Sequence, residues 1–284
     1  MKVGIGLPNT LSIDGTQMVA WARRAEERGF TALGTIDRIV YPTYDSLTAL
    51  AVAAGATSRI GLFTDILLAP LYPAAVLAKA TASLHAMSGG RFTLGVAVGG
   101  RPDDYAAVER PFEHRGRILD ETLHALRRAW AGEPIAGGDF AVGPPPAGGG
   151  RVPLLVGGQS DATIRRVVEY GDGWTVGGSA PDAIAPMHEK VTKAWHEAGR
   201  EGEPRMAALA YFGLGDAEAS AAALLRYYGF LGDYADMIAG SALRTPDQVR
   251  AAVAAYDGAG ITELYLMPTV ASVDEVDRLA DVVL

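Results

Sequence analysis

Short apolar runs alternate with longer stretches in which apolar residues recur at helical spacing along nearly the whole chain. The apolar runs are rich in β-branched residues and predict strands, whereas a spacing of three and four predicts amphipathic helices. The predicted strands are residues 3–7, 32–36, 60–69, 92–98, 152–156, 174–176, 206–214 and 261–267. The predicted helices are residues 16–27, 46–57, 73–87, 115–130, 160–170, 181–198, 246–259 and 274–283.

Eight strands that alternate with helices and are mostly apolar on both faces favour a closed parallel (β/α)₈ barrel, the TIM barrel. A doubly wound open sheet is the alternative. Residues 132–150, rich in glycine and proline, predict a loop or short hairpin inserted before the fifth strand. Residues 216–241 predict a helical insertion with aromatic residues after the seventh strand. Because the same alternation continues on both sides of residues 132–150, we expect one domain over residues 1–284.

Composition and charge narrow the functional classes without changing the predicted fold. The 284 residues carry a formal net charge of −8 and no basic run, which disfavours a nucleic-acid partner. The absence of cysteine excludes disulfides, thiolate nucleophiles, iron–sulfur clusters and cysteine-based zinc sites. No histidine pair has the spacing of a zinc motif, so no metal is expected. The N-terminus is too short for a signal peptide and no apolar run approaches the ~20 residues of a membrane span, so we expect a cytoplasmic protein without a membrane partner.

Three predicted strands end in paired glycines: Gly99-Gly100, Gly157-Gly158 and Gly177-Gly178. The carboxyl ends of barrel strands are where active sites of this fold assemble. Backbone amides of glycine can approach an anion closely, and a helix N-terminus adds the positive end of its dipole. Ser160 and Thr163 lie one helical turn apart behind the second pair, so both hydroxyls can reach the same phosphate.

Paired glycines can also serve tight turns alone, with Ser160 as an ordinary helix cap. Three pairs at equivalent positions favour a ligand cradle over that alternative. The Gly-x-Gly-x-x-Gly fingerprint is absent after the first strand, and no Walker-type Gly-Lys-Thr occurs, so the usual motifs for NAD and ATP are missing.

The run of residues 88–99, Ser-Gly-Gly-Arg-Phe-Thr-Leu-Gly-Val-Ala-Val-Gly, closely resembles the luciferase-like monooxygenase family of flavin-dependent enzymes. Residues 77–79 and 111–117 have family-like spacing on either side of it. Residues 154–174 and 261–268 are also similar to family segments. The resemblance therefore extends nearly from end to end.

This resemblance implies a bacterial luciferase-like (β/α)₈ barrel that binds reduced FMN, or alternatively the deazaflavin coenzyme F420, at the carboxyl ends of its strands. In this family the isoalloxazine ring of the flavin often packs against a bulge after the third strand, and this bulge frequently contains a non-proline cis peptide. Thr64 and Asp65 occupy that position here. The phosphate site implied by the resemblance lies after the fifth strand. Its residues would be Gly157, Gly158, Gln159, Ser160 and Thr163, with Gly177 and Gly178 from the neighbouring loop.

The resemblance also marks Asp37 and Arg38, at the end of the second strand, as candidate catalytic residues. Members that use the deazaflavin often carry Asp-His there, so the missing histidine disfavours F420. Arg38 would instead offer a fixed cation to the flavin pyrimidine or to an anionic substrate.

Four side chains are candidates for substrate contacts. Tyr41 and Tyr72 follow the second and third strands, His114 precedes the helix at 115–130, and Tyr211 lies in the seventh strand. Tyr41 and Tyr72 can equally be packed anchors of their loops.

Arg101 follows the fourth strand and can reach a phosphate, or it can remain a solvated charge beside Asp103 and Asp104. The aromatic residues within 227–234 predict a lid or a substrate wall after the seventh strand, with a subunit contact as the alternative, because the family commonly dimerises.

These features predict a flavin-dependent oxidoreductase, a monooxygenase that uses reduced FMN and O2 on a small organic substrate. The implied partners are that substrate, a separate flavin reductase and a second copy of the chain in a homodimer. Two alternatives stay open: an F420-dependent dehydrogenase or reductase that transfers hydride without O2, and a non-catalytic flavin-binding barrel. The substrate itself depends on loops whose sequence varies in such folds.

Overall fold

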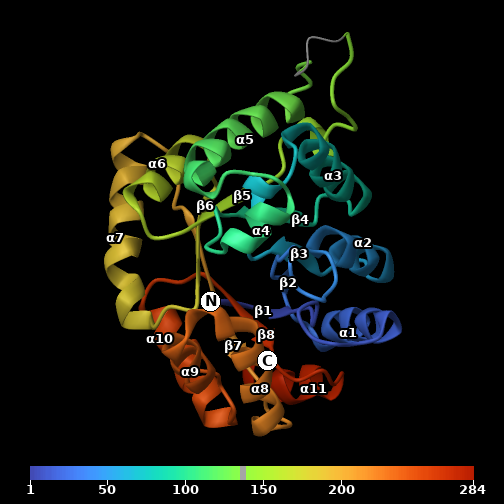
Figure 1. The fold of residues 1–284 in the computed structure, drawn as a ribbon, viewed down its shortest axis with the longest axis vertical. Coiled ribbons are helices and arrows are strands. Elements are labelled where there is room, and N and C mark those ends of the chain that lie inside the picture. The colour runs from blue at the N-terminus through green and yellow to red at the C-terminus, as the bar shows by residue number, and fades with distance from the viewer. Residues whose placement is uncertain (135–138) are drawn as a thin grey trace.

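The computed structural model describes residues 1–134 and 139–284, and its centre is a closed barrel of eight parallel strands (Figure 1). Each strand pairs with the next one along the chain, and the last pairs with the first. The predicted TIM barrel is confirmed. The strands are β1 (Lys2–Gly6), β2 (Ala32–Thr35), β3 (Gly61–Thr64), β4 (Phe92–Val96), β5 (Leu154–Gly157), β6 (Gly173–Gly177), β7 (Arg205–Phe212) and β8 (Glu263–Pro268).

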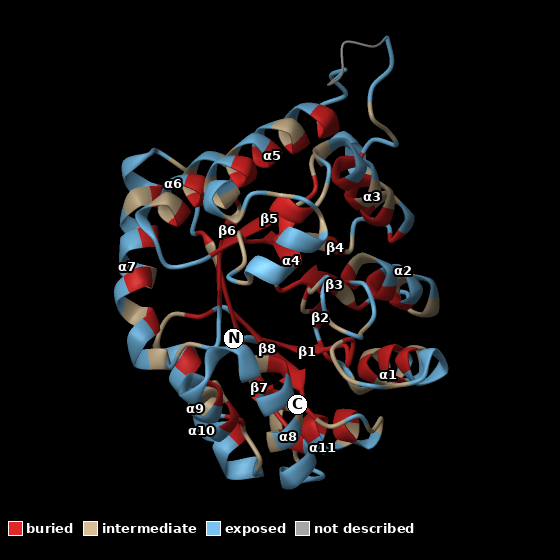
Figure 2. Cartoon of the chain, viewed as in Figure 1, coloured by how far each residue is buried: buried red, intermediate tan, exposed pale blue. Residues whose placement is uncertain are grey.

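Helices surround the barrel and bury one face each against it, while their outer faces remain exposed (Figure 2). Their N-termini are capped where the sequence supplies oxygen side chains: Asp14 and Thr245 form capping boxes, and Asp45, Ser160 and Asp216 accept from backbone amides. The helices are α1 (Gly15–Arg28), α2 (Ser46–Ala56), α3 (Ala74–Met87), α4 (Pro102–Ala107), α5 (Arg115–Trp130), α6 (Asp161–Tyr170), α7 (Pro181–Glu197), α8 (Ala217–Tyr228), α9 (Asp233–Gly240), α10 (Pro246–Gly258) and α11 (Asp274–Val283).

Large side chains fill the inside of the barrel because glycines on neighbouring strands leave room for them. The rings of Phe63 and Tyr265 lie 4.7 Å apart between centroids. A Cβ atom on Gly4 would lie 2.7 Å from the ring of Tyr265, and one on Gly34 would lie 2.9 Å from Met267 Cε. The barrel is therefore a packed core that is open to ligands at its ends.

The third strand is shorter than predicted, since β3 ends at Thr64 and the predicted strand 60–69 is wrong beyond that residue. The chain advances four residues from Phe63 to Leu67 while the facing strand advances three, from Thr93 to Val96, so β3 is followed by a bulge. The peptide bond between Asp65 and Ile66 within it is cis. Both features agree with the resemblance drawn from the sequence.

A short helix, α4, follows β4 where the sequence predicted a loop. Six residues are too few to display helical periodicity, which explains why it was missed. The predicted helical insertion after the seventh strand consists of α8, a 3-10 turn at Gly229–Leu231 and α9. Within the predicted loop insertion at 132–150, residues 135–138 lie outside the described residues, and the rest contains a 3-10 turn at Ala147–Gly149.

In the described part of the chain, none of the helices combines the length and the apolar composition that crossing a membrane requires.

Candidate functional site

A cavity of about 310 Å³ lies at the carboxyl ends of the strands, beneath α8 and α9. The ends of β2, β3 and β6 line it together with aromatic residues of the insertion. A second cavity, of about 470 Å³, lies at the opposite end of the barrel. Charged side chains in that second cavity already have partners: Arg205 pairs with Glu263 at 2.7 Å, and Glu26 accepts from the backbone of Ser58. Barrel active sites form at the carboxyl ends, so the first cavity is the candidate site.

Asp37, predicted to be catalytic, lines this cavity at the end of β2 and is 3% exposed. It accepts hydrogen bonds from the backbone amide of Leu68 at 2.9 Å and from the hydroxyl of Tyr72 at 3.2 Å. Burial raises the pKa of Asp37 to about 6, although these hydrogen bonds oppose the shift. Tyr72 therefore anchors the loop after β3 to the end of β2, and it is not among the residues that line the cavity.

Arg38 also lines the cavity, and the cation that the sequence suggested is held there by ion pairs. Its Nε lies 2.8 Å from Asp104 Oδ2, and its Nη2 lies 3.3 Å from Asp103 Oδ2. Asp104 is fully buried, and its Oδ1 accepts from the amides of Ile39 and Val40 at 3.0 and 2.7 Å. Asp104 was missed at the sequence level because it is far from Arg38 along the chain. It compensates the charge of Arg38 and ties α4 to the loop after β2.

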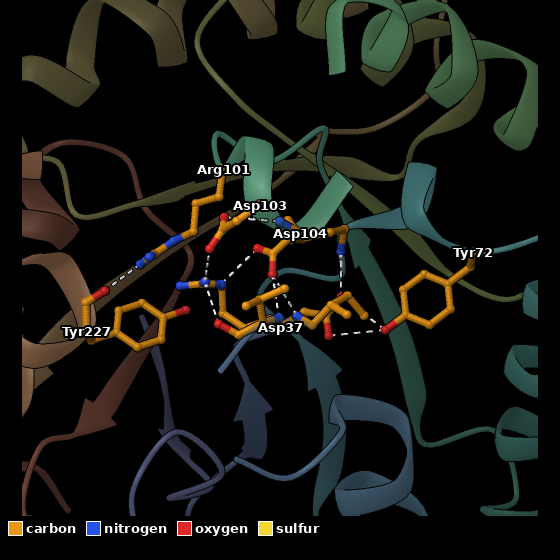
Figure 3. A network of polar contacts seen from close by, with 10 residues as sticks. Asp37, Tyr72, Arg101, Asp103, Asp104 and Tyr227 are labelled. Carbon is orange, nitrogen blue, oxygen red and sulfur yellow. Dashed lines mark hydrogen bonds and ion pairs between the residues drawn. The ribbon is translucent and has the colours of Figure 1, made fainter. Parts of the chain in front are cut away.

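Arg101, at the start of α4, bonds to the insertion rather than remaining a solvated charge. Its Nη2 donates to the carbonyl oxygen of Tyr227 at 2.5 Å, and its guanidinium carbon lies 3.6 Å from the ring centroid of Phe230. Desolvation by these neighbours lowers the pKa of Arg101. Through Arg101 and Asp104, α4 joins the loop after β2 to the insertion across the cavity mouth (Figure 3).

The two residues predicted at the bulge face different surroundings. Thr64 is fully buried, and its Oγ1 both donates to the carbonyl oxygen and accepts from the amide of Gly95 at 2.8 Å. It therefore holds the bulge against β4. Asp65 lines the cavity, and its Oδ1 accepts from Thr175 Oγ1 at 2.7 Å.

The loops after β5 and β6 form a cradle of donors at the N-terminus of α6. Ser160 caps this helix, and its Oγ lies 3.2 Å from Thr163 Oγ1. Gly158 has a φ of +123°, and a Cβ there would lie 2.7 Å from Thr163 Oγ1, so the close approach requires glycine. Gln159 Nε2 donates to Ser179 Oγ at 2.7 Å, which joins the two loops.

The family model of the luciferase-like monooxygenases matches residues 1–244. The chain belongs to this family. An uncharacterized protein of Mycobacterium tuberculosis is 31% identical over 214 residues, which cover 66% of this chain and 74% of that protein.

Two solved structures share the luciferase-like barrel at low sequence identity. An F420-dependent secondary alcohol dehydrogenase, in complex with an F420–acetone adduct, has a TM-score of 0.79 and 19% identity, covering 100% of this chain and 98% of that one. The oxygenating constituent of 3,6-diketocamphane monooxygenase from Pseudomonas putida, in complex with FMN, has a TM-score of 0.72 and 17% identity, covering 94% and 91%. At these identities the likeness shows the fold.

In this luciferase-like barrel, seven of the sixteen residues predicted for the site line one cavity: Asp37, Arg38, Asp65, Arg101, Gly177, Gly178 and Tyr211. Tyr211 lines it, and its hydroxyl lies 2.5 Å from that of Tyr228. Tyr41 packs its ring against Tyr227 at 5.0 Å, beside Arg38. Gly177 and Gly178 also line the cavity.

His114 was predicted as a substrate contact, but it lies in an exposed 3-10 turn before α5 and is not among the residues that line the cavity. Tyr227, Tyr228 and Phe230 form an aromatic wall of the cavity, and the lid or substrate role predicted for residues 227–234 stays a prediction. Among the described residues, no group of three or more histidine, aspartate or glutamate side chains is arranged to hold a metal ion.

Proposed function

We propose that the chain is a flavin-dependent oxidoreductase, a monooxygenase that uses reduced FMN and O2 on a small organic substrate. The observation that carries this proposal is the connection between the cradle and the cavity. Gly177 and Gly178 line the cavity, and the next residue, Ser179, is hydrogen-bonded to Gln159 of the cradle. A ligand with a phosphate at one end and a ring at the other can therefore occupy both.

The residues present fit such a ligand. Ser160 and Thr163 would hold the phosphate with their hydroxyls and with the backbone amides at the start of α6, where the helix dipole favours an anion. Apolar side chains of Ile66, Leu68 and Leu209 line the cavity and would exclude water from the ring. Reduced FMN, when bound, supplies the electrons for oxygen chemistry, and the chain positions the substrate beside it.

The aromatic wall of the insertion would determine which substrates enter. Tyr228 and Phe230 line the cavity together with Asp37 and with Asp65 and Ile66 of the bulge. Wide rings of this kind favour an apolar or aromatic organic substrate over a strongly hydrated one.

Hydride transfer with coenzyme F420 is the second candidate function, because a structure of that activity shares the barrel at a TM-score of 0.79. Arg38 disfavours it, since the resemblance places a histidine at this position in many F420-dependent members. Arg38 is an ion-pair partner of Asp104 here.

Calorimetric titration with FMN and with F420, followed by oxygen-electrode measurements with reduced FMN and candidate substrates, tests the proposal. We expect FMN binding and substrate-dependent O2 consumption. Preference for F420 without O2 consumption would favour the dehydrogenase, and binding without turnover of any substrate would favour a non-catalytic barrel. Failure to bind either cofactor would overturn all three functions: the monooxygenase, the dehydrogenase and the non-catalytic flavin-binding barrel.

Changing Ser160 to alanine and Thr163 to valine together is expected to weaken FMN binding by about ten- to a hundredfold. A hydrogen bond to a charged group contributes about 1.5–3 kcal/mol, and part of the phosphate contact remains with the backbone amides. Riboflavin, which lacks the phosphate, is the matched ligand control, and its affinity should change little. An equal loss for both ligands would mean that the variant damages the fold instead of the phosphate contact.

A further inference from the structure

The bottom of the cavity holds a buried carboxyl group with one unsatisfied oxygen. Asp65 is 1% exposed and lines the cavity where the chain leaves β3. Its Oδ1 accepts from Thr175 Oγ1, whereas Oδ2 has no hydrogen-bond partner within residues 1–134 and 139–284. An unsatisfied buried polar atom costs free energy, which a ligand in the cavity can recover.

The other carboxyl group that lines the cavity, that of Asp37, has its hydrogen-bond partners within the protein. Asp37 has hydrogen bonds to both oxygens, from Leu68 and Tyr72. The two guanidinium groups of the cavity, Arg38 and Arg101, are engaged with Asp104 and with Tyr227. Of the two carboxyl groups, Asp65 is thus the one with an oxygen that lacks a hydrogen-bond partner among the described residues.

The surroundings of Asp65 favour its uncharged form. Burial, together with the nearby charge of Asp65, keeps Tyr211 of β7 and Tyr265 of β8 neutral by raising their pKa. Glu263, at the start of β8, belongs to the other end of the barrel and is paired with Arg205 at 2.7 Å. Burial raises the pKa of Asp65 to about 7, the negative charge of Glu263 adds to the shift, and the hydrogen bond from Thr175 opposes it.

We propose that Asp65, in its uncharged form, donates the proton on Oδ2 as a hydrogen bond to an acceptor atom of the ring bound in the cavity. This inference rests on the proposed function, because it requires a heteroaromatic ligand with carbonyl or ring-nitrogen acceptors. When Asp65 loses this proton, its Oδ2 and the acceptor atom of the ring are both hydrogen-bond acceptors and repel each other. The affinity for the ring therefore falls as the pH rises.

Calorimetric titration with riboflavin from about pH 6 to about pH 8.5 tests this role without interference from the phosphate, which itself ionises near pH 6. For a group with a pKa near 7 whose protonated form binds, the dissociation constant rises roughly 30-fold over this range. Asp65→Asn keeps a donor that cannot ionise, so its affinity should stay constant. The exposed Glu189→Gln on α7 should behave like the unchanged protein.

Carbon-13 NMR of the side-chain carboxyls in the ligand-free protein gives a second readout. We expect a titration near pH 7 that disappears in Asp65→Asn. If no titration near pH 7 is lost in Asp65→Asn, or if riboflavin affinity in Asp65→Asn depends on pH as in the unchanged protein, the role of Asp65 is overturned while the proposed function stands. Absence of binding by riboflavin, FMN and F420 at every pH would overturn the proposed function itself.

Discussion

Replacing Gly95 with alanine is expected to lower the free energy of unfolding by about 4 kcal/mol or more. A Cβ on Gly95 would overlap the carbonyl oxygen of Thr64 and lie 2.7 Å from Cε2 of Phe63. Because one of these atoms belongs to the backbone, β3 must move away from β4 and the bulge must shift. Urea unfolding followed by circular dichroism measures the loss.

A glycine elsewhere provides the control. A Cβ on Gly55, near the end of α2, would meet no atom within 4 Å, so Gly55→Ala should stabilise the protein by about 0.5–1 kcal/mol through helix propensity. Similar unfolding curves for the two variants would show that the packing between β3 and β4 tolerates displacement.

Replacing Asp104 with alanine is expected to cost about 3–5 kcal/mol of unfolding free energy, because it leaves the guanidinium of Arg38 without its buried counter-charge. The amides of Ile39 and Val40 lose their acceptor at the same time. Flavin affinity should fall as well, since the loop after β2 lines the cavity. Chemical unfolding and calorimetric titration measure the two effects.

The double variant Arg38→Leu, Asp104→Ala tests the cause, because removing both charges should be less costly than removing the carboxylate alone. Glu121→Ala on α5 is the comparison for an exposed ion pair: Glu121 and Arg117 are 61% and 64% exposed, so its loss should be below about 1 kcal/mol. If Asp104→Ala costs no more than Glu121→Ala, the proposed importance of the buried pair is wrong.

The sequence was most informative where the determining residues are neighbours along the chain. Ser160 and Thr163 are one helical turn apart, so their joint position at the start of α6 follows from helix geometry alone. The barrel itself follows from the repeated alternation of apolar runs and amphipathic stretches.

Features that depend on distant residues could not be predicted in this way. Residues 60–69 are nearly all apolar, so their periodicity does not reveal the extra residue of the bulge, which depends on Thr64 meeting Gly95. The ion pair of Arg38 was not expected, because its partner Asp104 belongs to another loop. The sequence does not distinguish Asp103 from Asp104, since α4 is too short to show which of them is buried.

The indole N–H of Trp174 donates to the carbonyl oxygen of Gly158 at 2.7 Å, and the side chain is fully buried beneath the cradle. This contact makes Trp174 an intrinsic fluorescence reporter of the loop that carries Ser160, because indole emission responds to the polarity and hydrogen bonding around the ring. The chain has four tryptophans, so Trp174→Phe supplies the blank against which the signal is read. Binding of an anion at the cradle can thus be followed in real time without a label and without a coloured ligand.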